Sequence, residues 1–187
     1  KPTVQYELMV TSLGGTAEHD GTPMVMGMCH FTPSTPVEIV ETEYPIRIRK
    51  FDVWQDSAGA GRTRGGIGFV REYEMLSDVI LTARTANHEQ PGWGVAGGEG
   101  PPVCVTSINP DGPDAVELAA LDTREATAGT IVRLEQTGGS GYGNPLERDP
   151  ARVLEDVRNG YVSEEVAVAK YGVVVSDGQV DKAATAA

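Results

Sequence analysis

The sequence has few basic residues for its size. Its 187 residues include 15 Lys and Arg against 27 Asp and Glu, which gives a formal net charge of −12. Nucleic acids and anionic membrane surfaces are bound through clustered Lys and Arg side chains, so this composition argues against both kinds of partner. Hydrophobic residues make up 40% of the chain, which excludes an intrinsically disordered protein.

The sequence also has no apolar run of the length that a transmembrane helix requires. No secretory signal peptide is apparent, and we therefore expect a cytoplasmic protein.

Cysteine and histidine are too scarce for a local metal motif. Cys29 and Cys104 form no CxxC pair, so we expect two buried thiols. No two of the three histidines have HxH or HExxH spacing. His19 and Asp20 are adjacent in a polar loop and are weak candidates for metal ligands, although an isolated surface histidine usually has no such role.

Two glycine-rich segments carry no complete catalytic motif. Residues 59–65 miss the GxGxxG pattern by one position, and a strand follows them where a phosphate site would need a helix N-terminus. Ser140 lies in GGSGYG, which does not meet the GxSxG pattern of a serine nucleophile. We interpret both segments as glycine turns.

Short segments with alternating or continuous apolar residues predict a mainly β protein. The expected strands are 4–10, a strand after Pro45 within 37–54, 67–76, 79–85, 103–109, 115–121 and 130–136. The predicted fold class is α+β, mainly β, with an antiparallel sheet or a β-sandwich-like region and two short C-terminal helices.

The two helices have clear boundary signals. Asp149 is a suitable N-cap before Pro150, and Gly160 ends the first helix. Ser163 caps the second helix, which Gly172 ends. We therefore predict a β-rich domain over 1–148, a helical segment over 149–175 and a flexible tail over 176–187.

Three arginines around the first glycine-rich segment are notable in so acidic a chain. Arg62, Arg64 and Arg71 can bind a substrate carboxylate or an acidic partner surface, since guanidinium groups form bidentate pairs with carboxylates. They can equally be solvated or paired with the many Asp and Glu residues of the chain. The residues alone leave both alternatives open.

Several blocks in order resemble the C-terminal third of the hydantoinase B family. They are GGTAEHDG (14–21), TPVEIVETEYPIRI (35–48), DSAGAGRTRGGIGFVREY (56–73), NPDG (109–112) and GGSGYGNPLERDPARVLEDVRNGYVSEEVAVAKYGVVV (138–175). The family includes the B-type components of hydantoinases, the corresponding half of 5-oxoprolinase, and subunits of acetone and acetophenone carboxylases. Ser34 departs from the family pattern, which has asparagine there, and this puts an ordinary hydantoin or oxoproline substrate in doubt.

The resemblance implies part of an ATP-dependent, heteromeric enzyme. An A-type subunit would bind ATP and Mg²⁺ and phosphorylate an amide or enolate oxygen, and the B-type subunit would complete hydrolysis or carboxylation. The N-terminal part of the B-type fold, which this chain lacks, would hold any metal ion. We expect this chain alone to be inactive, with Thr35, Glu38, Arg62, Arg64 and Arg71 as candidate substrate or interface residues.

Overall fold

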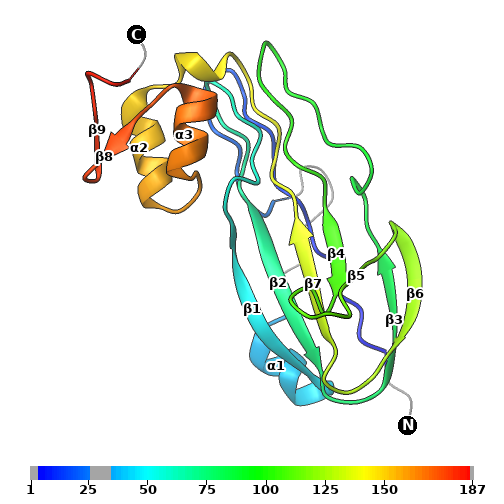
Figure 1. Ribbon diagram of the computed structural model, residues 1–187. Helices are drawn as coiled ribbons and strands as arrows, with labels where there is room; N and C mark the ends of the chain where they lie inside the picture. Colours follow the sequence, from blue (N-terminus) through cyan, green and yellow to red (C-terminus); the bar gives the residue numbers. More distant parts are fainter. Residues whose placement is uncertain (1–3, 26–34, 186–187) are drawn as a thin grey trace.

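A central antiparallel sheet organises the computed structural model, which describes residues 4–25 and 35–185 (Figure 1). Its strand order is β1-β2-β7-β4-β5, and every neighbouring pair is antiparallel. A separate two-stranded antiparallel sheet, β3 with β6, lies beside it. The strands are β1 (Ile46–Trp54), β2 (Gly68–Met75), β3 (Val79–Arg84), β4 (Val105–Ile108), β5 (Val116–Glu117), β6 (Leu121–Ala126) and β7 (Ile131–Gln136). The predicted mainly β, antiparallel fold class is therefore confirmed.

The alternation in the sequence of β1 corresponds to two different faces of the sheet. Ile48 pairs in register with Tyr73 of β2, and both pack in an apolar cluster that includes Val132. Arg47 and Arg49, on the opposite face, each form an ion pair with Glu74. Strand side chains alternate between faces, so this half-buried pattern follows from the sequence.

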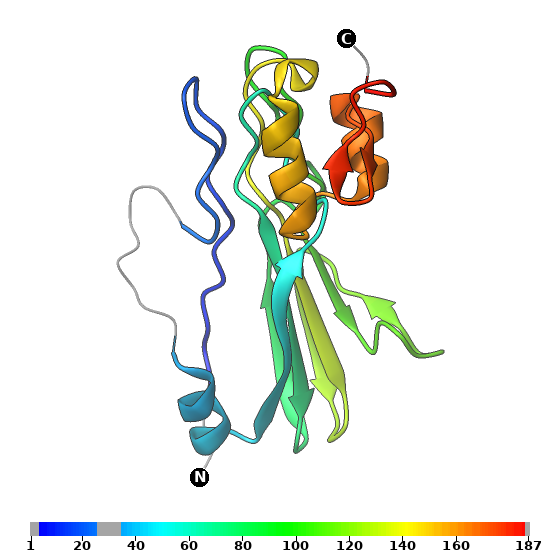
Figure 2. The same ribbon diagram turned by 90° about the vertical axis from the view of Figure 1, so that its left-hand side faces the viewer.

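Two expectations about the strands are wrong. Residues 115–121 do not form one strand, because only Val116–Glu117 pairs with β4, and β6 begins at Leu121. The second error concerns residues 4–10, which are extended but belong to no strand. Figure 2 shows this N-terminal segment on the same side of the sheet as helix α1 (Val37–Glu43), which was not expected from the sequence.

The two C-terminal helices begin and end as predicted. In α2 (Pro150–Arg158), the side chain of Asp149 accepts a hydrogen bond from the Ala151 amide. In α3 (Glu164–Tyr171), the Ser163 side chain accepts one from the Val166 amide, and Gly172 ends the helix in the left-handed region with φ 67°. A short 3-10 helix, η1 (Pro145–Glu147), precedes α2.

The helices pack on the β-rich part through a second apolar cluster. It joins Ala60, which follows β1, to Val153 of α2 and Ala167 of α3. The hairpin of β8 (Val175–Ser176) and β9 (Gln179–Val180) begins at the last residue of the expected helical segment and continues into the expected tail, where Val180 packs against this cluster. The division into 1–148, 149–175 and 176–187 stays a prediction.

Candidate functional site

Four segments rich in glycine meet at the end of the sheet beside α2 and α3 (Figure 1). Their backbones bond directly to one another. The Gly59 amide donates to the carbonyl of Gly139, and the Gly141 amide donates to the carbonyl of Glu99. Thr63 and Tyr142 exchange two backbone hydrogen bonds of 3.1 and 3.0 Å. We call this region, built from residues 12–22, 56–67, 91–102 and 137–144, the glycine-rich junction.

The glycines are needed because the backbones of the junction touch. A Cβ atom at Gly141 would overlap the carbonyl oxygen of Ala60, and one at Gly65 would overlap that of Gly139. Real side chains do not tolerate such contacts with backbone atoms, so the packing itself requires glycine at these positions.

The same hydrogen bonds argue against a phosphate site in the junction. A phosphate-binding loop directs free backbone N–H groups at its ligand. Here the amides of Gly59, Gly139 and Gly141 all donate to carbonyls of neighbouring segments. Among the described residues no group of three or more His, Cys, Asp or Glu side chains is placed to hold a metal ion. These three junction amides are therefore not free to bind a phosphate group.

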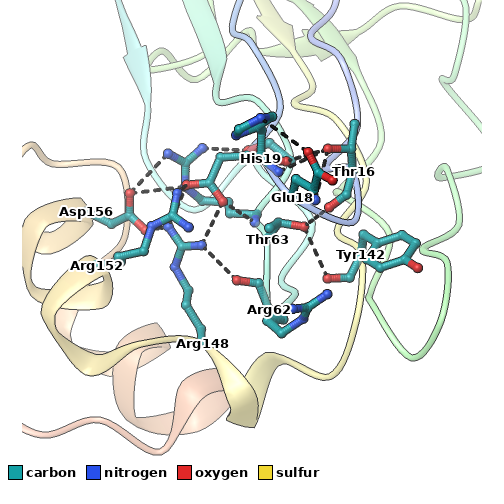
Figure 3. A network of polar contacts seen from close by, with 12 residues as sticks. Thr16, Glu18, His19, Arg62, Thr63, Tyr142, Arg148, Arg152 and Asp156 are labelled. Atoms are coloured by element: carbon teal, nitrogen blue, oxygen red, sulfur yellow. Dashed lines mark hydrogen bonds and ion pairs between the residues drawn. The ribbon is translucent and has the colours of Figure 1, made fainter.

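A network of largely buried arginine and aspartate side chains joins the junction to α2 (Figure 3). Arg148 forms two hydrogen bonds to the Asp20 carboxylate, Nη1–Oδ1 of 2.7 Å and Nη2–Oδ2 of 2.9 Å. Its Nη2 also donates to Oδ2 of Asp156 at 2.7 Å. Arg64 donates from Nε and Nη2 to the other oxygen of Asp156, at 3.2 and 3.0 Å. We call these four residues the arginine–aspartate network.

The network connects three parts of the chain that are distant in sequence. Asp20 comes from the N-terminal loop, Arg64 from the β1–β2 connection, and Asp156 from α2. The side chains of Arg148, Arg64 and Asp156 are 1%, 8% and 7% exposed. Removing one partner from such a buried set leaves an uncompensated charge, so the network fixes the helices on the β-rich part.

Charge complementarity controls the ionisation of Asp20. Burial alone would raise the pKa of this carboxyl group, but the hydrogen bonds and positive charge of Arg148 outweigh it. The amide and guanidinium of Arg64 act in the same direction, and the pKa of Asp20 lies below its ordinary value. Asp20 therefore stays a carboxylate bound by arginines, and its oxygens are occupied by protein donors.

Several polar side chains remain accessible at the edge of the network. Arg62 is exposed and donates from Nη2 to the carbonyl of Ala17 at 3.0 Å. His19 is 83% exposed, and its Nε2 lies 3.8 Å from a carboxylate oxygen of Glu18 (Figure 3). Together with Glu18 they form a mixed-charge surface next to the junction.

The structure does not bring the five predicted binding residues together. Arg62 and Arg64 lie at the glycine-rich junction, whereas Thr35 and Glu38 are exposed at α1, at the opposite end of β1. Arg71 lies within the sheet, 2% exposed, and pairs with Glu7. For Arg64 and Arg71 the structure shows the pairing within the chain that the sequence left open, and a binding role for any of the five stays a prediction.

Some residues singled out from the sequence cannot be placed. Ser34, Cys29 and His30 lie outside the described residues, as does most of the apolar stretch that follows Met24. Cys104 is buried as expected, and burial raises the pKa of its thiol even though the Thr137 amide donates to the sulfur.

Sequence reasoning did not select Arg148 and Asp156, which are central to the network. One signal was available for Asp156, because it lies three residues after Val153 on the buried face of α2. A carboxylate on the apolar face of a helix requires a buried partner. No comparable pattern indicates Arg148, since its partner Asp20 is 128 residues away in the sequence.

Comparison with known proteins places this architecture in a family. The sequence model described as Hydantoinase B/oxoprolinase matches residues 1–145. The chain belongs to the hydantoinase B/oxoprolinase family. The resemblance seen in the sequence blocks is therefore confirmed, and the segments that form the glycine-rich junction are largely the blocks that carried it.

Relatives within the hydantoinase B family differ in their named activities. The chain is 33% identical over 94% of its length to the B component of a putative D-/L-hydantoinase of Pseudomonas sp. (strain NS671), covering 30% of that protein. It is 36% identical over 98% of its length to the beta component of the caprolactamase of Pseudomonas jessenii, covering 33% of that protein. It is 29% identical over 97% of its length to the alpha component of the acetone carboxylase of Xanthobacter autotrophicus, covering 29% of that protein.

Two solved structures share the fold. The crystal structure of ATP-dependent caprolactamase from Pseudomonas jessenii superposes with a TM-score of 0.82 at 32% identity, over 95% of this chain and 32% of that one. Nucleotide-free acetone carboxylase superposes with a TM-score of 0.77 at 25% identity, over 94% of this chain and 28% of that one. The chain thus spans about a third of the length of these relatives. Among the described residues no helix is both long and apolar enough to cross a membrane.

Proposed function

We propose that this chain forms the C-terminal part of the B-type component of an ATP-dependent cyclic-amide hydrolase. It works with an A-type subunit that binds ATP and Mg²⁺, and with the N-terminal part of the B-type fold. The observation that carries the proposal is the match to caprolactamase, which combines 36% identity over 98% of the chain with a TM-score of 0.82.

The chemistry explains why such an enzyme would divide its work between components. An amide carbonyl carbon is weakly electrophilic, and phosphorylation of its oxygen lets water add to that carbon. The ring C–N bond then breaks, the nitrogen leaves as a protonated amine, and hydrolysis of the resulting acyl phosphate releases phosphate and the carboxylate. Phosphoryl transfer needs positioned cations around the transferred group. This chain has a net charge of −12 and junction amides bonded to its own carbonyls, so the ATP step is assigned to the A-type subunit.

The role of this chain within the assembly is structural positioning. The side chains of the arginine–aspartate network pair with one another within the chain. We expect accessible residues beside it, including Arg62 and His19, to contact a neighbouring subunit or the shared cleft. We therefore expect the separate chain to be inactive and the assembled complex to be active in the cytoplasm.

An ATP-dependent ketone carboxylase is the second candidate. The match to the alpha component of acetone carboxylase supports it, because that match also covers nearly the whole chain. Both activities use the same first step, activation of an oxygen atom by phosphorylation. They differ in the second reactant, which is water in the hydrolase and bicarbonate in the carboxylase.

One experiment separates the two candidates. The B-type polypeptide carrying this sequence is co-purified with its A-type partner and incubated with ATP and Mg²⁺. It receives either a panel of lactams and hydantoins or a panel of ketones with ¹⁴C-bicarbonate. We expect ATP-dependent ring opening without fixation of label. Fixation of label into an acid-stable product, without ring opening, would replace the hydrolase by the carboxylase, and neither reaction would overturn both.

A further inference from the structure

The N-terminal segment, residues 4–10, has an inverted pattern of burial. Side chains of an extended segment alternate between two sides. The outward row consists of Val4, Tyr6 and Leu8, which are 85%, 81% and 44% exposed. Gln5 and Glu7 belong to the inward row, which is partly buried. The outward row is thus apolar, whereas the inward row begins with two polar residues and ends with Met9.

This orientation is fixed by specific contacts. Oε1 of Glu7 accepts a hydrogen bond of 2.6 Å from Nη1 of Arg71, and Oε2 accepts one of 2.7 Å from the Tyr73 hydroxyl. Arg71 also stacks on the Phe51 ring, 5.0 Å from its centroid. An ion pair this buried holds Glu7 against the sheet, so the outward position of Tyr6 is built into the fold.

The backbone of the segment is unpaired within the described residues. The first backbone hydrogen bond along this part of the chain is made by the Leu13 amide, which donates to Thr22. Among the strands of the described residues, none pairs with this segment. An extended segment with free N–H and C=O groups is a template for strand addition.

We propose that residues 4–10 are a docking strand for a part of the B-type polypeptide outside this sequence. The inference rests on the proposed function in that its occupant is a B-type segment. That occupant supplies a strand that pairs with the free backbone and an apolar surface that covers Val4, Tyr6 and Leu8. The relatives are about three times as long as this chain, so a B-type component has ample further polypeptide to fill this role.

Charge argues against a second copy of this chain as the occupant. Two copies of a chain with net charge −12 repel each other.

Hydrogen exchange in the assembled protein tests the proposal. The assembly is isolated through a tag at the C-terminal end of this sequence, and exchange is followed by mass spectrometry on peptides covering residues 4–10. We expect these amides to exchange about 100-fold more slowly than those of the mostly exposed loop at 86–90, whose described amides donate no backbone hydrogen bond, as strand amides do. Exchange at the rate of that loop would overturn the proposal.

Matched variants and a cross-link identify the partner. Tyr6→Asp should abolish the protection of residues 4–10 in the assembly. Ile80→Asp places the same charge at a position that is 74% exposed on β3 and should keep the protection. A photoreactive phenylalanine derivative in place of Tyr6 should cross-link to a B-type peptide outside this sequence. A cross-link only to residues within 1–187, or equal protection in both variants, would contradict it.

These measurements do not depend on the proposed reaction. They need neither ATP nor substrate, so an assembly that shows protection but no ring opening would reject the hydrolase function and leave the docking strand standing.

Discussion

Arg148 and Asp20 form a bidentate ion pair across 128 residues of sequence, with nitrogen–oxygen distances of 2.7 and 2.9 Å. This pair joins the loop before Gly21 to the residue that precedes the N-cap of α2. The C-terminal helices are therefore attached to the β-rich part by a side-chain contact as well as by the chain itself.

The first prediction concerns the pH dependence of this pair. The pKa of Asp20 is lowered in the folded state, so its contribution to stability is complete above the unfolded pKa of about 3.9 and is lost as pH falls through the lower folded value. Asp20→Asn should lower the free energy of unfolding at pH 7 by about 3 kcal/mol. It should also flatten the loss of stability below pH 4, measured by urea unfolding from pH 3 to 7.

Asp111→Asn is the matched control for this variant. Asp111 also pairs with an arginine, Arg133, but its side chain is 78% exposed. Exposed pairs contribute at most about 1 kcal/mol, so the effect should be small at neutral pH. Equal losses in the free energy of unfolding in the two variants would show that the Asp20 pair contributes no more to stability than an exposed ion pair.

A second prediction separates Arg64 from Arg62. Arg64→Gln removes a buried partner of Asp156 and should lower the free energy of unfolding by about 3–5 kcal/mol. Arg62→Gln changes an exposed residue and should alter stability by no more than about 0.5 kcal/mol. If Arg62 contacts a neighbouring subunit, its variant should still weaken assembly or ATP-coupled turnover, measured by native mass spectrometry and a phosphate-release assay. Wild-type assembly and turnover would leave Arg62 as a solvated surface charge.

The third prediction concerns the packing of the glycine-rich junction. In Gly141→Ala the new Cβ overlaps the carbonyl oxygen of Ala60, and the two segments must separate. We expect a loss of about 1–3 kcal/mol in the free energy of unfolding, together with a lower yield of assembled complex. Gly14→Ala is the control, because its Cβ meets the Ser140 oxygen at 3.3 Å and needs only a small adjustment. Normal melting with abolished turnover in the Gly141 variant would instead place this turn in the active site.

The fourth prediction concerns alkaline conditions. Burial raises the pKa of Tyr171 to about 12, with Arg148 acting against the shift and Asp156 adding to it. The raised pKa favours folding fully below the unfolded value of about 10, and this contribution is lost as pH rises through the folded value. Tyr171→Phe should therefore show a shallower fall in the urea midpoint between pH 10 and 12 than the wild type. An unchanged slope would show that Tyr171 is not what limits stability in alkali.

The sequence predicted those elements whose signals are local. Asp149 with Pro150 marks the start of α2, and the alternation around Ile46 and Ile48 marks β1, because capping and strand periodicity depend on neighbouring residues. Helix α1 lacks such a signal, since its N-cap is Pro36 and no side chain caps it. Strand β6 is mostly polar, so its sequence alone does not indicate a strand. The strand is formed through its pairing with β3.

The candidate site was less predictable because it is assembled from distant segments. The arginine motif at 62–64 indicated the right loop, but its sequence could not show that Arg64 turns inward to Asp156 while Arg62 remains exposed. The same limit applied to residues 4–10. Their alternation correctly indicated an extended backbone, yet strand formation also requires a partner, which the described residues of this chain do not contain.

The contact of bare backbones at the junction has a mechanical consequence. The oxygen of Gly139 occupies the space that a side chain at Gly65 would need. The two segments therefore cannot slide or tilt without losing both their backbone hydrogen bonds and their close packing. This end of the molecule therefore moves as a rigid block with α2. If the complete enzyme opens and closes during turnover, its hinge lies outside the junction. The other parts then move relative to this rigid block.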